Sequence, residues 1–351
     1  MWGFKRKNSA PSEPLIQAPK RPVFLHGMWR SGTTFVWSRF RAAPTTYAYY
    51  EPFHHGLAKL TKDRIARDTP ETMTANHHPA LAKPYFAEFE PLLKFRGVQN
   101  HSANFAYDRF ALAPGDQHRP LEQYVDRLVD HAAAEDRTAV VGCNRTVFRI
   151  GWLKERYSPY DIHIDRDPYA VWSSYVQQME KGNYSFLTYW MMVLERNAEH
   201  PMFAPLAKRL PLRGSPRQFM RKAKDFYRET LDRMSPEMSY GIVFYMWAAA
   251  ALHALSYCDL VFDMNRLGDK AYLEKLMAAI RQGAGVDVNL DEARVVEAAF
   301  DNSGPDRHAV EQAVMPLFPR DAFRNFVLPT EAEGRLDDLA PNKARLLGSI
   351  L

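Results

Sequence analysis

The segment VFLHGMWRSGTTF, residues 23–35, constrains the fold more than any other part of the chain. It starts with an apolar run at Val23 that is typical of a buried strand, continues through a loop bounded by Gly27 and Gly32, and reaches Thr33, where a helix is expected to begin. In this order of elements, the loop amides and the first helical N–H groups converge on one point, where the helix dipole favours negative charge. The segment therefore predicts an α/β fold with a binding site for phosphate or sulfate.

The loop departs from the common nucleoside triphosphate motif at one position. Four residues separate Gly27 from Gly32, as in that motif, but Thr33 follows where a lysine is needed. Because that lysine reaches the outer phosphates, ordinary ATP or GTP hydrolysis is disfavoured. Arg30 supplies a cation from within the loop instead. The alternative interpretation is a tight strand-to-helix turn that binds no ligand.

A second segment indicates where another anionic group would bind. Further strands are expected at residues 138–142 and 160–165, and the second leads to Arg166 and then to Pro168, which suits the first position of a helix. Ligands collect at the carboxyl ends of parallel strands, so Arg166 is expected to face the same crevice as the first loop. Ser174 lies about two helical turns further on, so Arg166 must fold back along the helix for both to reach one phosphate. An ordinary surface salt bridge is the alternative role for Arg166.

Together the two segments resemble the sulfotransferases that use 3′-phosphoadenosine 5′-phosphosulfate (PAPS), with bacterial and carbohydrate sulfotransferases the most similar. In that family, a loop of the form basic-Ser-Gly-Thr-Thr-aromatic binds the 5′-phosphosulfate, and an Arg followed eight residues later by a Ser binds the 3′-phosphate. Arg166 and Ser174 match the second pattern. The loop pattern is matched by Arg30, Ser31, Gly32, Thr33, Thr34 and Phe35. The resemblance implies that Arg30 contacts the bridging oxygen of PAPS and that Phe35 lies against the adenine.

The resemblance also implies the fold, which is a central parallel sheet with helices on both faces, as in the P-loop nucleotide-kinase-like fold of sulfotransferases. Loose similarity continues to about residue 290 and includes a helix, a strand and a second helix within residues 251–276. We divide the chain into a flexible basic tail, residues 1–21, and a single domain, residues 22–351. The domain is expected to carry helical insertions at about 52–137 and 183–247.

The same resemblance implies PAPS as the donor, adenosine 3′,5′-bisphosphate as the product, and no metal; no convincing metal-ligand spacing is found in the sequence. Sulfuryl transfer resembles phosphoryl transfer in having a loose transition state, so neutralising the departing phosphate matters most, and Arg30 is the candidate for that role. Cytosolic members of the family also carry an Arg-Lys-Gly triplet that contacts the 3′-phosphate, and this chain lacks it. Arg307 and Arg320 are weak candidates for such a third contact.

The acceptor hydroxyl must lose a proton, and Glu51 is the predicted base. It lies in YAYYEPFHH, residues 47–55, which resembles the segment after the first helix in carbohydrate sulfotransferases. Burial raises the pKa of a carboxylate toward the working pH. His54 is the alternative catalytic residue and His55 a second, because imidazole titrates near neutrality, although surface positions are the plainer interpretation of both. Glu51 itself has a helix-capping or surface role as its alternative.

Glu51, His55 and Arg145 are predicted to contact the acceptor. Arg145 follows the strand at 138–142 and therefore lies at the same edge of the sheet as the first loop. The acceptor is expected to be a carbohydrate, a polysaccharide or a glycolipid. A small-molecule P-loop kinase and a nucleotide-binding relative without catalysis are the alternative functions.

Composition limits the compartment and the partners. The chain of 351 residues has only two cysteines, which favours a reducing compartment, and it contains neither about 18 consecutive apolar residues nor the apolar centre of a signal peptide. We therefore expect a cytoplasmic protein. The net charge of +5 and a basic run from Lys208 to Lys224 favour anionic partners, but no nucleic-acid-binding module accompanies them. Trp2 and Phe4 beside basic residues in the tail suit peripheral contact with the inner face of the membrane.

Overall fold

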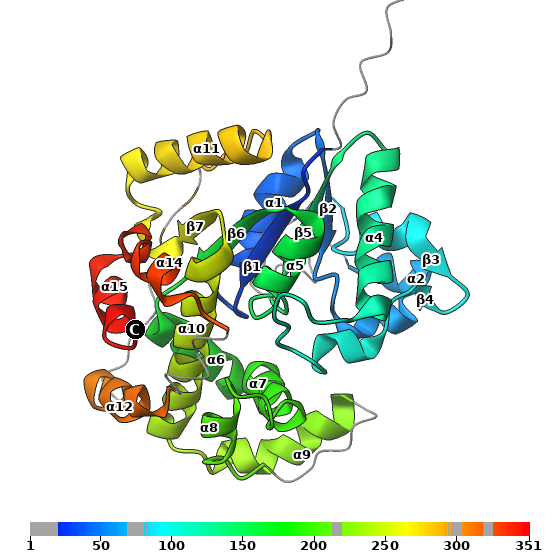
Figure 1. Cartoon of the computed structure of the whole chain (residues 1–351). Helices are drawn as coiled ribbons and strands as arrows, with labels where there is room; N and C mark the ends of the chain where they lie inside the picture. Colours follow the sequence, from blue (N-terminus) through cyan, green and yellow to red (C-terminus); the bar gives the residue numbers. More distant parts are fainter. Residues whose placement is uncertain are drawn as a thin grey trace, which may run out of the picture.

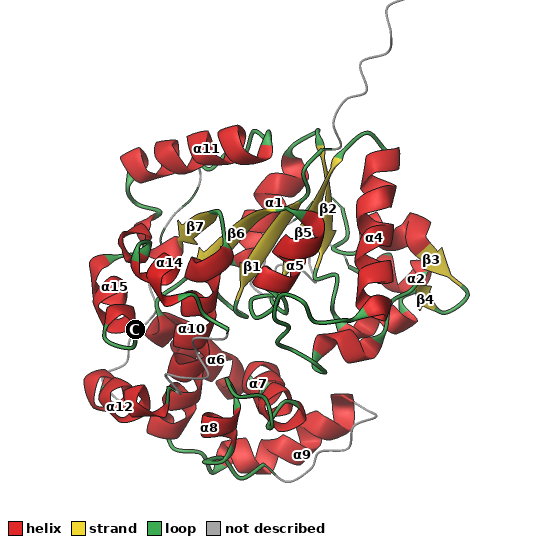
Figure 2. Ribbon diagram, in the orientation of Figure 1, coloured by secondary structure: helices red, strands yellow, loops and turns green. Residues whose placement is uncertain are grey.

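The computed structural model describes residues 20–351 except 69–80, 82, 213–219, 292, 294, 296–303 and 319–325. At its centre is a five-stranded sheet with the strand order β2-β5-β1-β6-β7, in which every neighbouring pair is parallel (Figures 1 and 2). The strands are β1 (Val23–Gly27), β2 (Thr46–Tyr50), β5 (Thr138–Cys143), β6 (Tyr160–Asp165) and β7 (Leu260–Asp263). The predicted α/β fold with a central parallel sheet is confirmed.

The centre of the sheet is formed by β1, which is covered on both faces. Val23, Phe24 and Leu25 are all fully buried, as expected for a strand with helices above and below it. Phe24 pairs with Val141 on one side and with Asp161 on the other. The apolar run at residues 23–25 is therefore the structural centre of the domain.

The helices form two layers, one on each face of the sheet. Alternate strand residues such as Leu25 pack against α1 (Thr33–Ala42) and α11 (Lys270–Ala284). On the other face, Phe24 and its neighbours pack against α4 (Arg119–Ala134) and α5 (Ile150–Tyr157). The prediction of helices on both faces is confirmed.

A helical lobe lies at the lower end of the molecule in Figure 1, built around α10 (Pro236–Tyr257). The helices around it are α6 (Pro168–Glu180), α7 (Ser185–Arg196), α8 (Ala204–Ala207), α9 (Met220–Asp232) and α12 (Arg307–Val314). α10 has the length and the hydropathy of a membrane span, but 94% of its most apolar window is buried inside the protein. It is therefore the core helix of this lobe, and it begins within the predicted insertion at 183–247 and ends beyond it.

Short elements occupy the predicted insertion at 52–137 and the C-terminal region. The first group is η1 (His55–Lys59), α2 (Lys62–Ile65), η2 (Ala87–Leu92), β3 (Leu93–Lys94), β4 (Gly97–Val98) and η3 (Ala103–Ala106), followed by α4. The second group is η4 (Met264–Arg266), η5 (Met315–Leu317), α14 (Pro329–Glu333), η6 (Leu336–Asp338) and α15 (Pro341–Gly348). The antiparallel β3–β4 hairpin projects at the right edge of Figure 1, away from the main sheet.

Strand β2 was not predicted from the sequence. Its residues TYAYY contain no run of Val, Ile or Leu, which is the usual signal of a buried parallel strand. The strand forms an edge of the sheet, where the large ring of Tyr49 packs inward and its hydroxyl donates to the Leu128 carbonyl at 2.9 Å. Aromatic burial at an edge therefore replaces the aliphatic pattern of the central strands.

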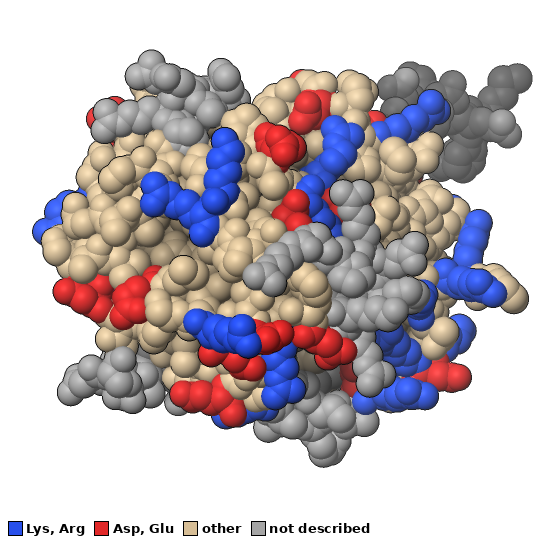
Figure 3. Space-filling view, turned by 90° about the horizontal axis from the view of Figure 1, so that it is seen from below, with Lys and Arg blue, Asp and Glu red and all other residues tan. Residues whose placement is uncertain are grey.

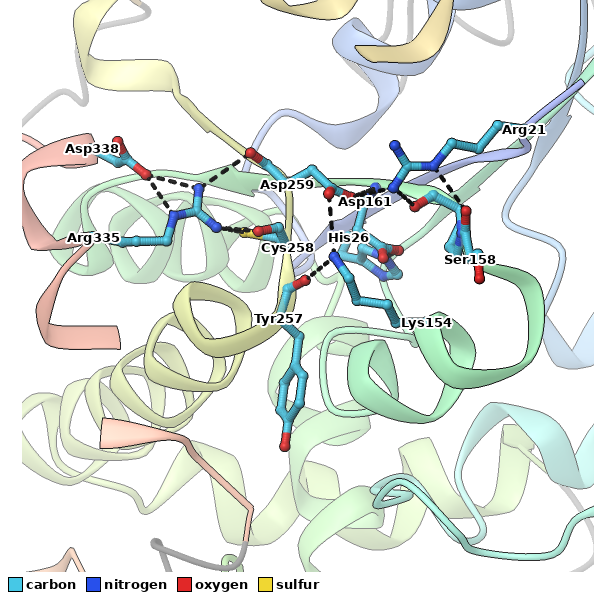
Figure 4. A network of polar contacts seen from close by, with 11 residues as sticks. Arg21, His26, Lys154, Ser158, Asp161, Tyr257, Cys258, Asp259, Arg335 and Asp338 are labelled. Carbon is cyan, nitrogen blue, oxygen red and sulfur yellow. Dashed lines mark hydrogen bonds and ion pairs between the residues drawn. The ribbon is translucent and has the colours of Figure 1, made fainter. Parts of the chain in front are cut away.

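Ion pairs and hydrogen bonds join the amino ends of β6 and β7 (Figure 4). Asp259 pairs with Arg21 at 3.1 Å and with Lys154 at 3.3 Å, and its carboxylate accepts from the Asp161 amide at 2.9 Å. Arg335 donates to the Cys258 carbonyl in the same region. These contacts fasten the segments around Arg21 and Arg335 to the amino ends of the strands, and the candidate site lies at the opposite, carboxyl ends.

One glycine permits the close approach of α1 to the sheet. A Cβ on Gly142 of β5 would lie 2.7 Å from the ring of Trp37. We predict that Gly142→Ala destabilises the protein by about 1–3 kcal/mol, because the buried Trp37 must move. Urea unfolding measures this. Gly268→Ala is the matched control, since its nearest atom would be 4.0 Å away. Equal stability of the two variants would show that the Trp37 contact does not limit packing.

Candidate functional site

The candidate site begins with the loop between β1 and α1. The loop contains two residues with left-handed backbones, Arg30 at φ 67° and Gly32 at φ 98°. The positive φ of Gly32 favours glycine, and a Cβ there would also displace the end of the Met264 side chain. Gly32 is the N-cap of α1 but supplies no side-chain cap, and by helix geometry the amides that begin at Thr33 lack intrahelical acceptors. The predicted strand, loop and helix start are confirmed, and helix termini of this kind favour anions.

Arg30, Arg166 and Ser174 lie together at this loop, although Arg30 and Ser174 are 144 positions apart in the sequence. Arg30 Nε donates to Ser174 Oγ at 2.9 Å, and Arg166 Nη1 donates to the Arg30 carbonyl at 3.1 Å. The guanidinium of Arg30 also lies over the ring of Phe186, 5.6 Å from its centroid. The side chain that reaches Ser174 is therefore that of Arg30, whereas Arg166 reaches the backbone of the loop.

The electrostatics of this cluster favour an anionic ligand. Burial lowers the pKa of Arg30, and burial together with the Arg30 guanidinium lowers the pKa of Arg166, while Asp167 opposes this shift. Two partly buried cations are held close enough to repel each other. A bound phosphate or sulfate relieves this repulsion, since guanidinium groups form charge-assisted hydrogen bonds with such oxyanions.

Glu51 follows β2 directly, and its side chain is buried in a polar cluster. Its carboxylate accepts from Asn144 Nδ2 and from Arg145 Nη1. Its backbone adopts φ 45°, and its amide donates to the Gly142 carbonyl at 2.8 Å, so the residue is held at the carboxyl edge. Burial raises the pKa of Glu51, and the contacts with Arg145 and Asn144 limit the rise. Neither a helix-capping nor a surface role describes this carboxylate.

Arg145 is almost fully buried beneath three aromatic rings. Its guanidinium lies 5.2 Å from the ring centroid of Trp29, 5.9 Å from that of Tyr107 and 5.7 Å from that of Tyr189. Such rings stabilise a cation in a region where water does not reach it. Arg145 therefore acts as the fixed positive partner of Glu51.

Asn144 connects the loop to Glu51, and sequence reasoning did not identify it as a site residue. Its Oδ1 accepts from Thr33 Oγ1 at 2.6 Å while its Nδ2 donates to Glu51. A second link is the hydrogen bond of 3.1 Å between Thr34 Oγ1 and the Tyr50 hydroxyl. The available signal was position, because Asn144 comes directly after β5 at the carboxyl edge.

His54 and His55 follow Glu51 closely in the sequence, and each makes a hydrogen bond of its own. His54 caps η1, with its Nδ1 accepting from the Gly56 amide at 3.1 Å. Burial, and then the charge of Arg145, lower the pKa of His54 well below 6.5, so the expectation of titration near neutrality is wrong for this residue. His55 Nδ1 lies 3.3 Å from the Tyr107 hydroxyl.

The remaining candidates lie at the periphery or outside the described residues. Phe35 is partly buried. The guanidinium carbon of Arg39 lies 4.8 Å from the centroid of its ring. Arg307 pairs with Asp167 at 2.8 Å and with Glu311 at 2.7 Å, so its charge is already compensated. Arg320 lies outside the described residues, as does most of the tail at 1–21.

The surface charge is mixed in the part of the chain that the structure describes. Seen from below in Figure 3, basic and acidic side chains alternate across the helical lobe, and Lys and Arg gather toward the right side. Only Lys208 and Arg209 of the predicted basic run have described side chains, and both are exposed. Within the described residues, no group of three His, Cys, Asp or Glu side chains is arranged to hold a metal ion.

Comparison with known protein families identifies this arrangement. The model of the sulfotransferase family matches residues 22–208, which is more than half of the chain. The chain belongs to the sulfotransferase family. The match includes the loop and the residues from Glu51 to Ser174, and it ends before α9. Searches among curated proteins and among solved structures gave no significant match.

In this sulfotransferase, two groups of polar residues meet at the carboxyl ends of the strands. One is the start of α1 with the guanidiniums of Arg30 and Arg166, and the other is the buried ion pair of Glu51 and Arg145. Asn144 joins the two parts through Thr33. The resemblance drawn from the sequence is confirmed at the level of the family.

The pair between Glu51 and Arg145 can be tested through stability. Arg145→Met should destabilise the protein by about 3–5 kcal/mol, because it leaves the Glu51 carboxylate buried without its cation. Adding Glu51→Gln should restore part of this loss, which urea unfolding of the single and double variants measures. Arg233→Met is the control, since Arg233 pairs with Glu229 on the surface, and we expect little change. Additive losses for Glu51 and Arg145 would contradict the pairing.

Proposed function

We propose that this protein transfers a sulfuryl group from PAPS to a hydroxyl of a carbohydrate or glycoconjugate acceptor, without a metal ion. The observation that carries the proposal is the contact of Arg166 with the Arg30 segment of the loop, beside Ser174 and the start of α1. PAPS carries anionic groups at both ends of its ribose, and two cations from separate segments suit such a ligand. Membership of the family supports sulfuryl transfer as the general reaction.

Each end of the nucleotide has residues that fit it. The amides of Thr33 and Thr34, with Arg30, suit the 5′-phosphosulfate, because they combine a helix terminus with a cation. Arg166 and Ser174 suit the 3′-phosphate, and Phe35 is the proposed adenine contact. The half-buried position of both guanidiniums strengthens their interaction with an oxyanion.

The proposed reaction follows from these positions. Glu51 accepts the proton of the acceptor hydroxyl, whose oxygen forms a bond to sulfur while the bond between sulfur and the oxygen of the 5′-phosphate breaks. Arg30 and the loop amides stabilise the charge that develops on the departing phosphate. Arg145 and Asn144 orient Glu51 and stabilise its carboxylate, since burial by itself raises the pKa of this group.

Aromatic residues beside Arg30 and Arg145 support a sugar as the acceptor. Phe186 and Tyr189 of α7 are partly exposed, and one lies under Arg30 while the other lies near Arg145. Aromatic rings combine an apolar face with a polar edge, which suits the faces of sugar rings.

We propose the cytoplasm as the location, with the N-terminal tail as the contact to the inner face of the membrane.

Nucleotide binding tests the donor. Arg166→Ala should weaken binding of adenosine 3′,5′-bisphosphate about tenfold or more, because it loses a charge-assisted hydrogen bond to the 3′-phosphate, and should weaken adenosine 5′-phosphate far less. Calorimetric titration of both nucleotides measures the difference. Arg30→Ala is the matched variant and should weaken both ligands. Equal losses for both nucleotides on Arg166→Ala would contradict the assignment, and magnesium-dependent ATP turnover would favour a kinase instead.

Turnover tests the base. Glu51→Gln should retain affinity for adenosine 3′,5′-bisphosphate but lower kcat by about 10²–10⁴, because the hydroxyl proton has no acceptor. Radiolabelled PAPS with a panel of oligosaccharides measures this. In the unaltered protein, kcat should rise with pH through the pKa of Glu51, which burial places above 4.5. Retained turnover in Glu51→Gln together with its loss in His54→Ala would transfer the role to His54.

A further inference from the structure

A buried lysine from the end of the chain lies at the carboxyl ends of β6 and β7. Lys343 of α15 is 1% exposed, and its ammonium contacts three side chains there. It donates to Asp165, to Asp263 Oδ1 at 2.7 Å and to Asn265 Oδ1 at 3.2 Å. Lys343, 178 positions from Asp165 in the sequence, thus lies at the carboxyl ends of the strands, where the candidate site is.

The parallel register explains why a cation is needed at this point. Asp165 is paired with Asp263 across β6 and β7, and both carboxylates are buried. Two such carboxylates repel each other strongly unless a cation lies between them. Burial opposes the ionisation of Asp165, but Lys343 and His163 together offset this and lower its pKa. The two carboxylates in turn raise the pKa of Lys343 against the effect of burial.

The same cluster holds the turn that presents Arg166. Arg166 follows Asp165 directly, and the amide of the next residue, Asp167, donates to Asn265 Oδ1 at 2.8 Å. Asn265 Oδ1 is therefore shared between this amide and Lys343. The Asp167 side chain caps α6 by accepting from the Ala170 amide at 3.0 Å. Both residues that flank Arg166 are thus fixed. Lys343 holds Asp165 directly, and it holds Asp167 through Asn265.

We propose that Lys343 is a positioning residue for the 3′-phosphate end of the donor site. It holds the ends of β6 and β7 together so that Arg166 faces the loop at Arg30. Lys343 lies outside residues 22–208, the segment that the family shares. The C-terminal helix is thereby a functional part of the site. The inference rests on the proposed use of PAPS.

A second cation of the C-terminal region provides the control. Arg335 donates to the Cys258 carbonyl and pairs with Asp338 at 2.8 Å, at the amino end of β7 (Figure 4). Arg335 and Lys343 both connect the C-terminal region to β7, but Arg335 does so at the amino end of the strand and Lys343 at the carboxyl end. Loss of Arg335 therefore reports the general effect of loosening the C-terminal region.

The test compares adenosine 3′,5′-bisphosphate with adenosine 5′-phosphate in calorimetric titrations of the full chain. Lys343→Met and Asn265→Ala should each reduce the preference for the bisphosphate about tenfold, because Arg166 is no longer held in place. Arg335→Met should leave this preference unchanged even where it lowers the melting temperature. Asn265→Ala decides the question if Lys343→Met does not fold.

Two outcomes would overturn the inference. One is a folded Lys343→Met or Asn265→Ala variant with the preference of the unaltered protein. The other is an equal loss of preference in Arg335→Met, which would mean that Lys343 acts only through general stability. An unaltered protein that binds both nucleotides equally would instead contradict the proposed function.

Discussion

The site depends on keeping the side chains of Arg30 and Arg166 close together at the carboxyl ends of a parallel sheet. Arg30 and Arg166 come from loops after neighbouring strands, and they donate hydrogen bonds to the Ser174 hydroxyl and to the Arg30 carbonyl, respectively. Like charges that are partly buried in this way store repulsion, which an oxyanion relieves. The left-handed backbone at Arg30, the glycine at 32 and the start of α1 all serve to place this one cluster.

The same edge supplies the chemistry beside the anion site. Glu51 is buried, which raises its pKa, but Arg145 and Asn144 keep the carboxylate oriented and limit that rise. Asn144 also accepts a hydrogen bond from Thr33, so the position of Glu51 is linked to the first turn of α1. The proposed anion site and the proposed base are thereby joined by hydrogen bonds.

Much of this arrangement could be predicted because it is local in sequence. The strand, the glycine-bounded loop and the helix start at 23–35 lie in one continuous segment, and Pro168 marks the helix after Arg166. Strand β2 could not be predicted, since its burial rests on tyrosines at an edge rather than on an aliphatic run. The contacts of Asn144 and Lys343 were also beyond sequence reasoning, because both depend on which distant residues the strand order brings together.

In the proposed function, Arg30 and Arg166 bind opposite ends of a single adenine nucleotide. A crystal structure of the protein with adenosine 3′,5′-bisphosphate is the decisive measurement. We expect the 5′-phosphate on the amides of Thr33 and Thr34 beside Arg30, and the 3′-phosphate within hydrogen-bond distance of Arg166 and Ser174. A nucleotide bound with its 3′-phosphate away from Arg166, or bound at another edge of the sheet, would contradict it.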